Sequence, residues 1–166
     1  MSKTLHLIRH AKSSWQYPDL ADIDRPLNKR GKRDIKLMAK TMMEHGCDFN
    51  HLYCSPAERA RLTIKGLLKS LDYEETEWVV DSDLYTFDVN ELIKWCQKID
   101  NEQKSVTIIG HNPALTDLCR NLVSGCEIDN MPTCAYVHLT LNIDNWRDLA
   151  QGCGSVKVFI KPKNFK

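Results

Sequence analysis

The sequence predicts an α/β protein, a three-layer sandwich in which helices flank a mostly parallel central sheet. Short apolar runs alternate with longer segments whose apolar residues recur at helical spacing, and this strand–helix order repeats four times. Parallel strands covered on both faces typically show such apolar runs. Two late runs, residues 135–141 and 155–160, are joined by about a dozen residues without helical periodicity, which predicts one antiparallel strand.

The first third of the chain predicts a strand, a helix and a second strand. Residues 4–8 form the apolar first strand, and residues 51–54 form a brief second one. Between them, residues 29–45 carry an apolar stripe at helical spacing, and Gly46 ends this helix because glycine readily takes a left-handed conformation. The stripe consists of Ile35, Leu37, Met38, Met42 and Met43.

Two further helices start with the same signal, a capping residue followed by proline. Ser55 and Pro56 predict a helix to about residue 71, and Asn112 and Pro113 predict one to about residue 123. The segments between these helices are predicted as a strand at 76–80, a helix at 90–99 and a strand at 105–109.

Composition and charge exclude several classes of protein. The chain has 166 residues, with 23 Lys plus Arg against 22 Asp plus Glu, which argues against a polybasic protein that binds nucleic acid or a membrane surface. With 42% hydrophobic and 27% charged residues, we expect residues 1–166 to form a single globular domain. No uncharged run approaches the ~18 apolar residues of a membrane span, and no signal-peptide pattern precedes the first strand.

The cysteines predict a reducing compartment. There are seven, an odd number, and they are scattered through apolar stretches without a CxxC pair. Such thiols are typical of reduced core residues, so we expect a cytoplasmic protein. From the balanced charge and the short apolar runs, we expect no nucleic-acid or membrane partner. The oligomeric state is left open.

Basic residues and histidines follow the ends of three predicted strands. Arg9 and His10 end the first strand, Ser55 and the helix that carries Arg59 follow the second, and His111 follows the strand at 105–109. Carboxyl ends of parallel strands meet at one edge of an open sheet, where ligands bind. Two helix N-termini also favour anions there. The sequence therefore predicts a phosphate site.

The residue types suit phosphoryl transfer. Arginine offers a planar fork for phosphate oxygens, which the point charge of a lysine cannot match. The cations around His10 are expected to lower its pKa, so that the imidazole is neutral and nucleophilic near pH 7. A lone histidine after a strand is usually a loop residue, and only the joint arrangement indicates catalysis.

Four short motifs resemble those of the histidine phosphatase superfamily, and most closely its short phosphohistidine phosphatase branch of the SixA type. The resemblance covers roughly residues 5–118. The motifs are LIRHA at 7–11, RPLNKRG at 25–31, SPAERARLT at 55–63 and GHNPAL at 110–115. Each is weak alone, but their order at predicted strand ends is specific.

The resemblance implies a role for each motif residue. His10 is the nucleophile that becomes phosphorylated, and Arg9, Arg59 and His111 bind the phosphoryl oxygens. Arg25 is an additional phosphate ligand in this branch. The implied enzyme is a metal-independent phosphatase without a cofactor.

The sequence departs from the family pattern at two places. The glycine that usually follows the histidine is Ala11, and the Glu-bearing segment that supplies a general acid in mutase-like members has no clear counterpart around residues 83–89. Asp22 and Asp24, close to Arg25, are alternative candidates for the acid, although they equally fit a role as ion-pair partners of arginines.

The predicted function is the removal of phosphoryl groups, from protein phosphohistidine, through a covalent phosphohistidine intermediate. Phosphorylated imidazole leaves more readily than an alkoxide, so such a substrate requires less proton donation. The alternatives are a small-molecule phosphomonoesterase, a mutase of the same superfamily, and a phosphate- or phosphoprotein-binding module without turnover. The partner is accordingly a phosphorylated protein or a small phosphoester.

Rival interpretations exist for three further groups of residues. His45, Cys47, His51 and Cys54 resemble a zinc set, but Cys54 is expected to point into the core. The basic run KRGKR at 29–33 suits a nucleic-acid patch, but a position at the rim of an anion site explains these residues better. Trp15 and Tyr17 are expected either in the core or at the mouth of the site.

Overall fold

The structure is a computed structural model, and it describes residues 2–166. Four α-helices flank a six-stranded sheet with strand order β3-β2-β4-β1-β5-β6, which confirms the predicted α/β class. The strands are β1 (Lys3–Arg9), β2 (Leu52–Cys54), β3 (Val79–Val80), β4 (Ser105–Gly110), β5 (Tyr136–Leu141) and β6 (Gly154–Ile160). The helices are α1 (Lys29–Glu44), α2 (Glu58–Ser70), α3 (Val89–Gln97) and α4 (Ala114–Leu122), with short 3-10 turns at Asp22–Asp24, Ser82–Leu84, Trp146–Asp148 and Pro162–Phe165.

The sheet is mostly parallel, as predicted. β1 pairs in parallel with β4, which pairs in parallel with β2, and β2 with β3. β5 runs antiparallel to both β1 and β6, so the late pair is the predicted antiparallel one. The register places Arg9 beside Gly110 and Cys54 beside Ile109, so the carboxyl ends of β1, β2 and β4 lie at one edge.

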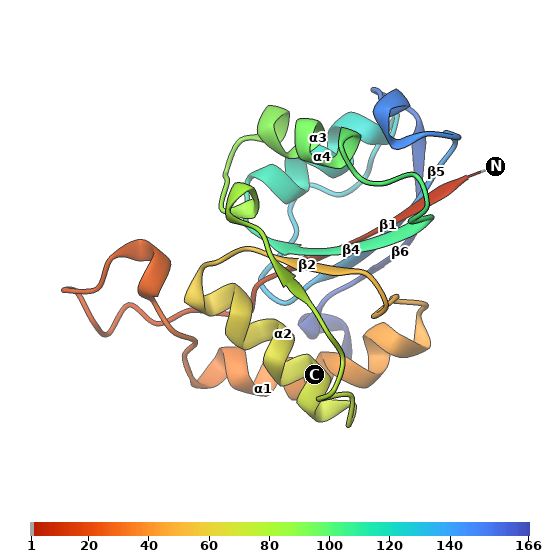
Figure 1. Ribbon diagram of the computed structural model, residues 1–166. Coiled ribbons are helices and arrows are strands. Elements are labelled where there is room, and N and C mark those ends of the chain that lie inside the picture. The colour runs from red at the N-terminus through yellow and green to blue at the C-terminus, as the bar shows by residue number, and fades with distance from the viewer. Residues whose placement is uncertain (1) are drawn as a thin grey trace.

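Helices cover both faces of the sheet (Figure 1). α1 and α2 bury Met38 and Ile64 against one face, where Ile8 and Leu52 also lie. On the other face, α3 and α4 pack with the strand residues Leu7 and Ile108, among others. Each buried apolar side chain stabilises the fold by roughly 1.5–3 kcal/mol, so the two apolar layers fix the position of the strand ends between them.

Three helix starts differ from the prediction by one or two residues. α2 starts at Glu58 rather than at Pro56, because the Ser55 hydroxyl does not cap a helix: it accepts the N–H of Ala57 at 3.2 Å and bonds a histidine described below. α4 starts at Ala114, although Asn112 does act as a cap by accepting the N–H of Thr116 at 3.1 Å. The strand predicted at 76–80 is reduced to Val79–Val80.

A loop between β1 and α1 extends away from the body of the molecule (Figure 1, at the left). It is fastened at its base by an antiparallel bridge between Ser13 and Leu27, and by the Ser14 N–H, which donates to the Pro26 carbonyl at 2.8 Å. α1 approaches this base so closely that a Cβ at Gly31 would collide with the Lys12 carbonyl oxygen. The base of the loop and the start of α1 therefore form one unit.

Two smaller features of the chain, a glycine turn and the cysteines, also follow the sequence prediction. Gly46 takes a φ of +91° after α1, as expected of a glycine C-cap. All seven cysteines are free, and five of them are buried. Within residues 2–166, none of the helices combines the length and apolar character that crossing a membrane requires.

Candidate active site

Three strand ends bring the predicted histidines and Ser55 together. The backbone N–H of His10 donates to the Gly110 carbonyl at 3.2 Å, and that of Ser55 donates to the Ile109 carbonyl at 3.1 Å. The sheet ladder thus continues one residue beyond the strands. His111 follows Gly110 directly, so both imidazoles start from neighbouring positions, and their ring centroids lie 5.2 Å apart.

His10 is buried, with 6% of its surface exposed, and its ring is held at both nitrogens. Nδ1 lies 2.8 Å from the carbonyl oxygen of Ala11, and because a carbonyl only accepts, this nitrogen carries the proton. Nε2 faces the Nε–H of Arg59 at 3.3 Å. Thr63 fixes the loop behind the ring by accepting the Ala11 N–H at 2.9 Å.

The electrostatics keep His10 neutral. The pKa of His10 is lowered to about 3. Burial is the largest cause, the Ala11 carbonyl acts against it, and Arg59, Arg9 and Arg25 add to the lowering. The direction is the one predicted from the sequence, but the main cause is burial rather than the neighbouring cations. At neutral pH the imidazole is therefore neutral, and its Nε2 lone pair accepts the Nε–H of Arg59.

His111 stands opposite His10 and is equally enclosed. Its Nε2 lies 2.7 Å from the Ser55 hydroxyl, and its Nδ1 lies 3.5 Å from the Nη2 of Arg59. Burial lowers the pKa of His111 to about 3, and the neighbouring His10 and Arg59 act in the same direction. Ser55 therefore orients a ring whose other nitrogen faces the cations.

Arg59 connects the histidines to the loop. Only 2% of it is exposed, and it lies in the first turn of α2, where Thr63 donates to its carbonyl at 2.7 Å. Its guanidinium donates to the Asp22 carbonyl from Nη1 at 2.6 Å and to the Asp22 carboxylate from Nη2 at 2.9 Å. One side of this guanidinium thus faces the histidines and the other faces the loop.

Arg9 and Arg25 complete the cationic lining. Arg9 donates from Nη1 to the Met131 carbonyl at 2.9 Å, while its Nε is buried without a hydrogen-bond partner among the described residues. Burial lowers the pKa of Arg9, and Arg59 lowers it further. Arg25 is buried between Asp22, at 3.3 Å from its Nε, and the indole of Trp15, whose centroid lies 3.6 Å from Cζ.

Asp22 is a bridging anion in this arrangement. Its carboxylate bonds Arg59 and accepts the Tyr85 hydroxyl at 2.6 Å. Burial alone would raise the pKa of Asp22, but the hydrogen bonds from Tyr85 and Arg59 outweigh it and lower the pKa to about 2. Asp22 is therefore ionised, and a donor role requires its arginine contacts to break. The exposed Asp24 carboxylate has no hydrogen bond or ion pair within residues 2–166.

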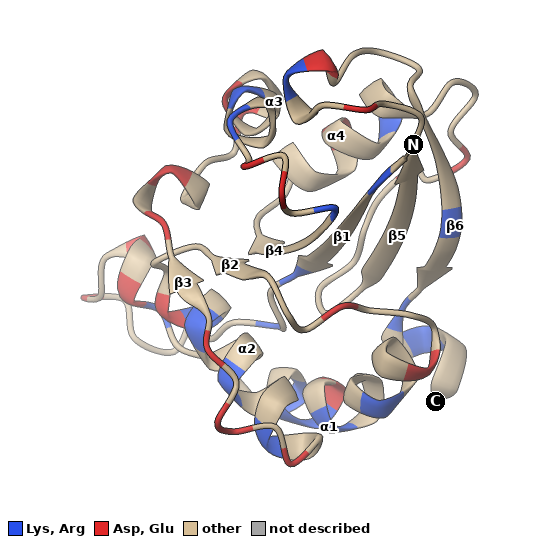
Figure 2. Ribbon diagram, turned by 45° about the vertical axis from the view of Figure 1, so that its right-hand side comes forward, with Lys and Arg blue, Asp and Glu red and all other residues tan. Residues whose placement is uncertain are grey.

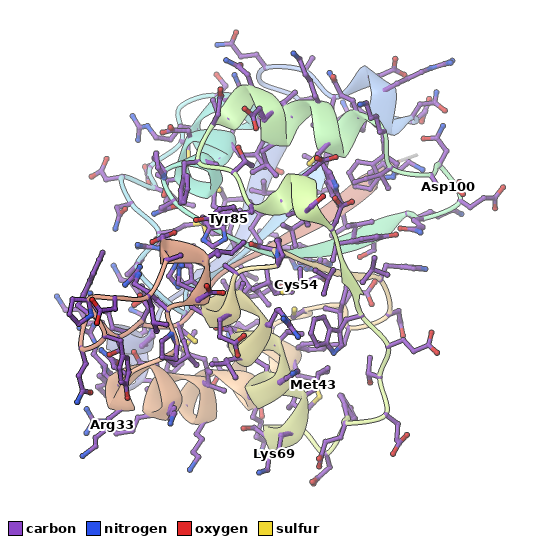
Figure 3. All side chains as sticks on the ribbon, turned by 60° about the vertical axis from the view of Figure 1, so that its left-hand side comes forward. Arg33, Met43, Cys54, Lys69, Tyr85 and Asp100 are labelled. Atoms are coloured by element: carbon purple, nitrogen blue, oxygen red, sulfur yellow. The ribbon has the colours of Figure 1, made fainter. Side chains whose placement is uncertain are left out.

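Two aromatic residues form a wall that sequence reasoning missed. Tyr85 and Phe87 lie with their ring centroids each 5.4 Å from that of His111, and Phe87 is 45% exposed. They belong to the segment at 83–89, in which the sequence shows no clear counterpart of a general acid, and Figure 3 marks Tyr85 beside the loop. Ser55 and Thr63 were missed too, although Thr63 lies one helical turn after Arg59 on the same buried face.

The zinc interpretation gains no support. Cys54 is fully buried in the core beneath α1 and α2, whereas His45 caps the exposed end of α1 and bonds the Thr41 carbonyl. In the part of the chain that the structure describes, no three His, Cys, Asp or Glu side chains form a group able to hold a metal ion. Trp15 and Tyr17 are exposed loop residues, not core.

Comparisons with known proteins match the chain to one family. Residues 5–92 match the model of the histidine phosphatase superfamily (branch 1). The chain is 28% identical over 168 residues to the uncharacterized protein Rv1276c of Mycobacterium tuberculosis (strain ATCC 25618 / H37Rv), covering 94% of this chain and 100% of the relative.

Two solved structures share the fold. One is a candidate phosphohistidine phosphatase SixA from Nakamurella multipartitia, with a TM-score of 0.80, 23% identity, and coverage of 98% of this chain and 97% of the other. The second is the protein histidine phosphatase SixA complexed with tungstate, with a TM-score of 0.78, 24% identity, and coverage of 98% and 99%.

Proposed function

The chain belongs to the histidine phosphatase superfamily, and on this premise we propose that it is a phosphatase that removes phosphoryl groups from protein phosphohistidine through a covalent intermediate on His10. The observation that carries the proposal is the state of His10. A backbone carbonyl holds the proton on Nδ1, so Nε2 is unprotonated, and its lone pair accepts a hydrogen bond of 3.3 Å from the Nε–H of Arg59 that an incoming phosphoryl group replaces.

The cations supply the place for the phosphoryl group. A cation 4 Å from an anion gains about 4 kcal/mol at an effective dielectric of 20, so Arg9, Arg25 and Arg59 together hold a dianion firmly. The buried Nε of Arg9 has no partner within residues 2–166, and an unpaired buried donor is costly unless a ligand accepts from it. A phosphoryl oxygen satisfies this donor. Tungstate, bound in the SixA relative, is an oxyanion of the same tetrahedral shape as phosphate.

The reaction then takes two displacements. In the first, the lone pair of His10 Nε2 attacks phosphorus, the P–N bond to the substrate imidazole breaks, and the leaving nitrogen takes a proton from solvent. In the second, a water oxygen attacks the phosphorus on His10, its protons leave to solvent and phosphate, and Nε2 regains its lone pair. Arg59 neutralises the charge on the phosphoryl oxygens in both steps, and the neutral His111 contributes a hydrogen bond from its ring.

The surroundings favour phosphohistidine over an alkyl phosphate. The segment at 83–89 turns the rings of Tyr85 and Phe87 toward His111, and Asp22 is ionised with its pKa lowered to about 2. An alkoxide leaving group depends on a proton donor far more than an imidazole does. The resting site offers no protonated carboxyl for that purpose, so the easier leaving group suits it.

We propose further that no metal ion takes part, because the arginines supply the charge neutralisation that Mg²⁺ or Zn²⁺ supplies elsewhere. Exhaustive treatment with EDTA is expected to leave the turnover number unchanged. Loss of turnover that one divalent ion restores would contradict the arginine mechanism.

The substrate class is tested by direct competition. A phosphohistidine-bearing protein, a phosphohistidine peptide and a panel of alkyl and sugar phosphates are compared by kcat/KM under one set of conditions. The proposal expects the phosphohistidine substrates to exceed every alkyl phosphate. A sugar phosphate with the highest kcat/KM would make the protein a small-molecule phosphomonoesterase, and phosphate binding without any turnover would make it a binding module.

A further inference from the structure

A groove opens between the loop and the start of α1, next to the candidate active site. It encloses about 540 Å³, and its walls include the apolar surfaces of Tyr17, Pro26 and Leu27. Ser14 lies in the same wall, and its carbonyl accepts the Nη1–H of Arg25 at 3.3 Å, so the groove and the phosphate pocket share one side. The groove thus leads away from the pocket along the loop.

The helical side of this groove is strongly basic. Lys29, Arg30 and Lys32 line it, and Arg33 follows on the exposed surface of α1. Figure 2 shows Lys and Arg gathered on α1, whereas Asp and Glu gather on the chain around β3. Figure 3 shows the Arg33 side chain reaching into solvent on the side of the loop. A chain of nearly balanced charge therefore has a basic side.

These cations stand where helix physics does not favour them. The first turn of α1 contains no acidic residue, although the positive end of a helix dipole prefers anions there. Arg30 has a carboxylate within reach, Asp34 at 3.6 Å, but Lys29, Lys32 and Arg33 have no ion pair within residues 2–166. Residues that go against such a local structural preference are typical of a functional surface. Anionic groups brought by a partner would compensate these charges.

The loop that forms one side of the groove carries exposed apolar residues. Tyr17, which lines the groove, is 50% exposed, and Trp15, which is 75% exposed, and Leu20 lie in the same loop. The Arg25 guanidinium lies against the Trp15 ring, and the loop base is hydrogen-bonded to the start of α1, where the Asn28 N–H donates to the Lys12 carbonyl at 3.0 Å. Aromatic side chains on a held loop are typical anchors of protein–protein interfaces.

We propose that this groove binds an acidic segment of the phosphorylated partner protein, beside its phosphohistidine, and so selects the substrate; this inference rests on the proposed function. Carboxylates of the segment pair with Lys29, Arg30 and Lys32, and an apolar side chain packs on Tyr17. The shared wall at Ser14 lets one continuous chain occupy the groove while its phosphoryl group reaches His10.

The mixture of charges favours a protein over a nucleic acid. A phosphate backbone is charged at every nucleotide, but the loop that forms the other wall also presents the exposed carboxylates of Asp19 and Asp24. A peptide places its carboxylates individually and fills the space between them with apolar groups, which matches basic residues on one wall and aromatic residues on the other.

The test uses three phosphohistidine peptides of equal length that carry glutamate, glutamine or lysine at the two to five positions on either side of the phosphorylated residue. Each is assayed with the wild-type chain and with the double variant Lys29→Glu/Lys32→Glu, together with p-nitrophenyl phosphate. The matched control is Lys98→Glu/Lys104→Glu, which changes the net charge equally at exposed positions away from the groove.

The glutamate peptide is expected to exceed the glutamine peptide in kcat/KM by about tenfold at low salt, through several exposed ion pairs each worth a factor of about two to five. The groove variant is expected to lose this preference through KM, the control variant to keep it, and p-nitrophenyl phosphate turnover to stay within about twofold because it lacks a flanking segment. High salt is expected to weaken the preference.

Two results would overturn the inference alone. The first is hydrolysis of all three peptides at equal kcat/KM, and the second is a loss of preference that is the same in the control variant. Inhibition by a single-stranded oligonucleotide that the groove variant abolishes, without any peptide preference, would assign the surface to nucleic acid. If p-nitrophenyl phosphate is hydrolysed but no phosphohistidine peptide is, the proposed function itself fails and the inference falls with it.

Discussion

Two buried histidines on the same stretch of chain differ in the role that we propose for them. His6 lies within β1, and His10 follows the end of that strand on the same side of the sheet. Both are almost completely enclosed, and burial lowers the pKa of His6 to about 4 and that of His10 to about 3. By type, burial and protonation the two residues are nearly equivalent.

They differ in their hydrogen-bond partners. His6 contacts the Tyr136 hydroxyl from Nδ1 at 2.7 Å and the Ser105 hydroxyl from Nε2 at 2.9 Å, so its lone pair and its proton are both used by neutral groups. His10 contacts a carbonyl, which only accepts, and this fixes the proton on Nδ1, while its Nε2 lone pair accepts a hydrogen bond of 3.3 Å from a cation, the guanidinium of Arg59. Burial makes a histidine neutral, but its partners decide whether it is a nucleophile.

The largest expected effect separates these two residues. Replacing His10 by Ala is expected to lower kcat by more than about 10⁴-fold, the scale of losing a nucleophile, while inorganic phosphate still binds to the arginines. His6→Gln is expected to retain turnover but to lower the free energy of unfolding by about 1–3 kcal/mol, because buried hydroxyls lose partners. Steady-state kinetics and urea denaturation measure the two effects.

The covalent intermediate gives an independent measurement. Quenching turnover at alkaline pH preserves a phosphoramidate, and mass spectrometry is expected to find the added phosphate on the peptide that contains His10. Label on Ser13, Ser14 or a cysteine, or substantial activity in His10→Ala, would contradict the mechanism and leave direct attack by water.

The next effect concerns the residues that face His10. Arg59→Ala and His111→Ala are each expected to lower kcat by about 10²- to 10³-fold, as for the loss of one preorganised donor to a developing charge. Arg61→Ala is the control, because its side chain is 42% exposed and turned toward Glu58 at 4.0 Å. Equal losses at positions 59 and 61 would mean that the pocket does not lie on this side of α2.

The sequence predicted the parts of the site that follow from strand order. Arg9 ends β1, and His10 and His111 come directly after β1 and β4, so the topology alone brings them to one edge. Arg59 follows from the buried face of an amphipathic helix. Arg25 was named from the resemblance of the RPL motif, and Asp22 only for its nearness in sequence to Arg25. Their contacts with Arg59 and Trp15 depend on how the loop folds back over the pocket.

Three features were beyond sequence reasoning for a physical reason. Ser55 has the signature of a helix cap, and only the structure shows its hydroxyl bonded to His111 instead. Tyr85 and Phe87 approach His111 through a segment with little regular structure, for which no periodicity specifies direction. The contrast between His6 and His10 depends on their hydrogen-bond partners. Tyr136, which bonds His6, lies 130 residues away in the chain, whereas Ala11, which bonds His10, is the next residue.

The next effect is smaller and concerns how the stability of the fold depends on pH through its buried histidines. Because the pKa values of His6, His10 and His111 lie at about 4, 3 and 3, below the ordinary 6.5, the unfolded chain binds more protons between pH 6.5 and about 3. The free energy of unfolding therefore falls as the pH drops through this window.

The pH profile of activity is expected to differ from that of stability, because activity depends on His10 and stability also depends on His6. A neutral His10 predicts that kcat/KM at pH 5 stays within a fewfold of its value at pH 7, provided the substrate keeps its charge. His6→Gln is expected to flatten the stability profile without moving the activity profile. An acid limb in kcat/KM at pH 6.5 would show that His10 is not held neutral.

The smallest expected effect tests whether Asp22 donates a proton or orients Arg59. Its carboxylate is 45% exposed and lies 2.9 Å from Arg59 Nη2, so Asp22→Asn removes one partly screened anion from the pocket. Inorganic phosphate is then expected to bind about two- to fivefold tighter, the scale of an exposed ion pair, with kcat on phosphohistidine changed only slightly. Inhibition constants measure this, with Asp24→Asn as the control that changes neither quantity. A fall in kcat of about 10²-fold or more on an alkyl phosphate, but not on phosphohistidine, would instead identify Asp22 as the general acid. In that case phosphate binding would have to raise the pKa of Asp22 from about 2, by displacing the arginine that now lowers it.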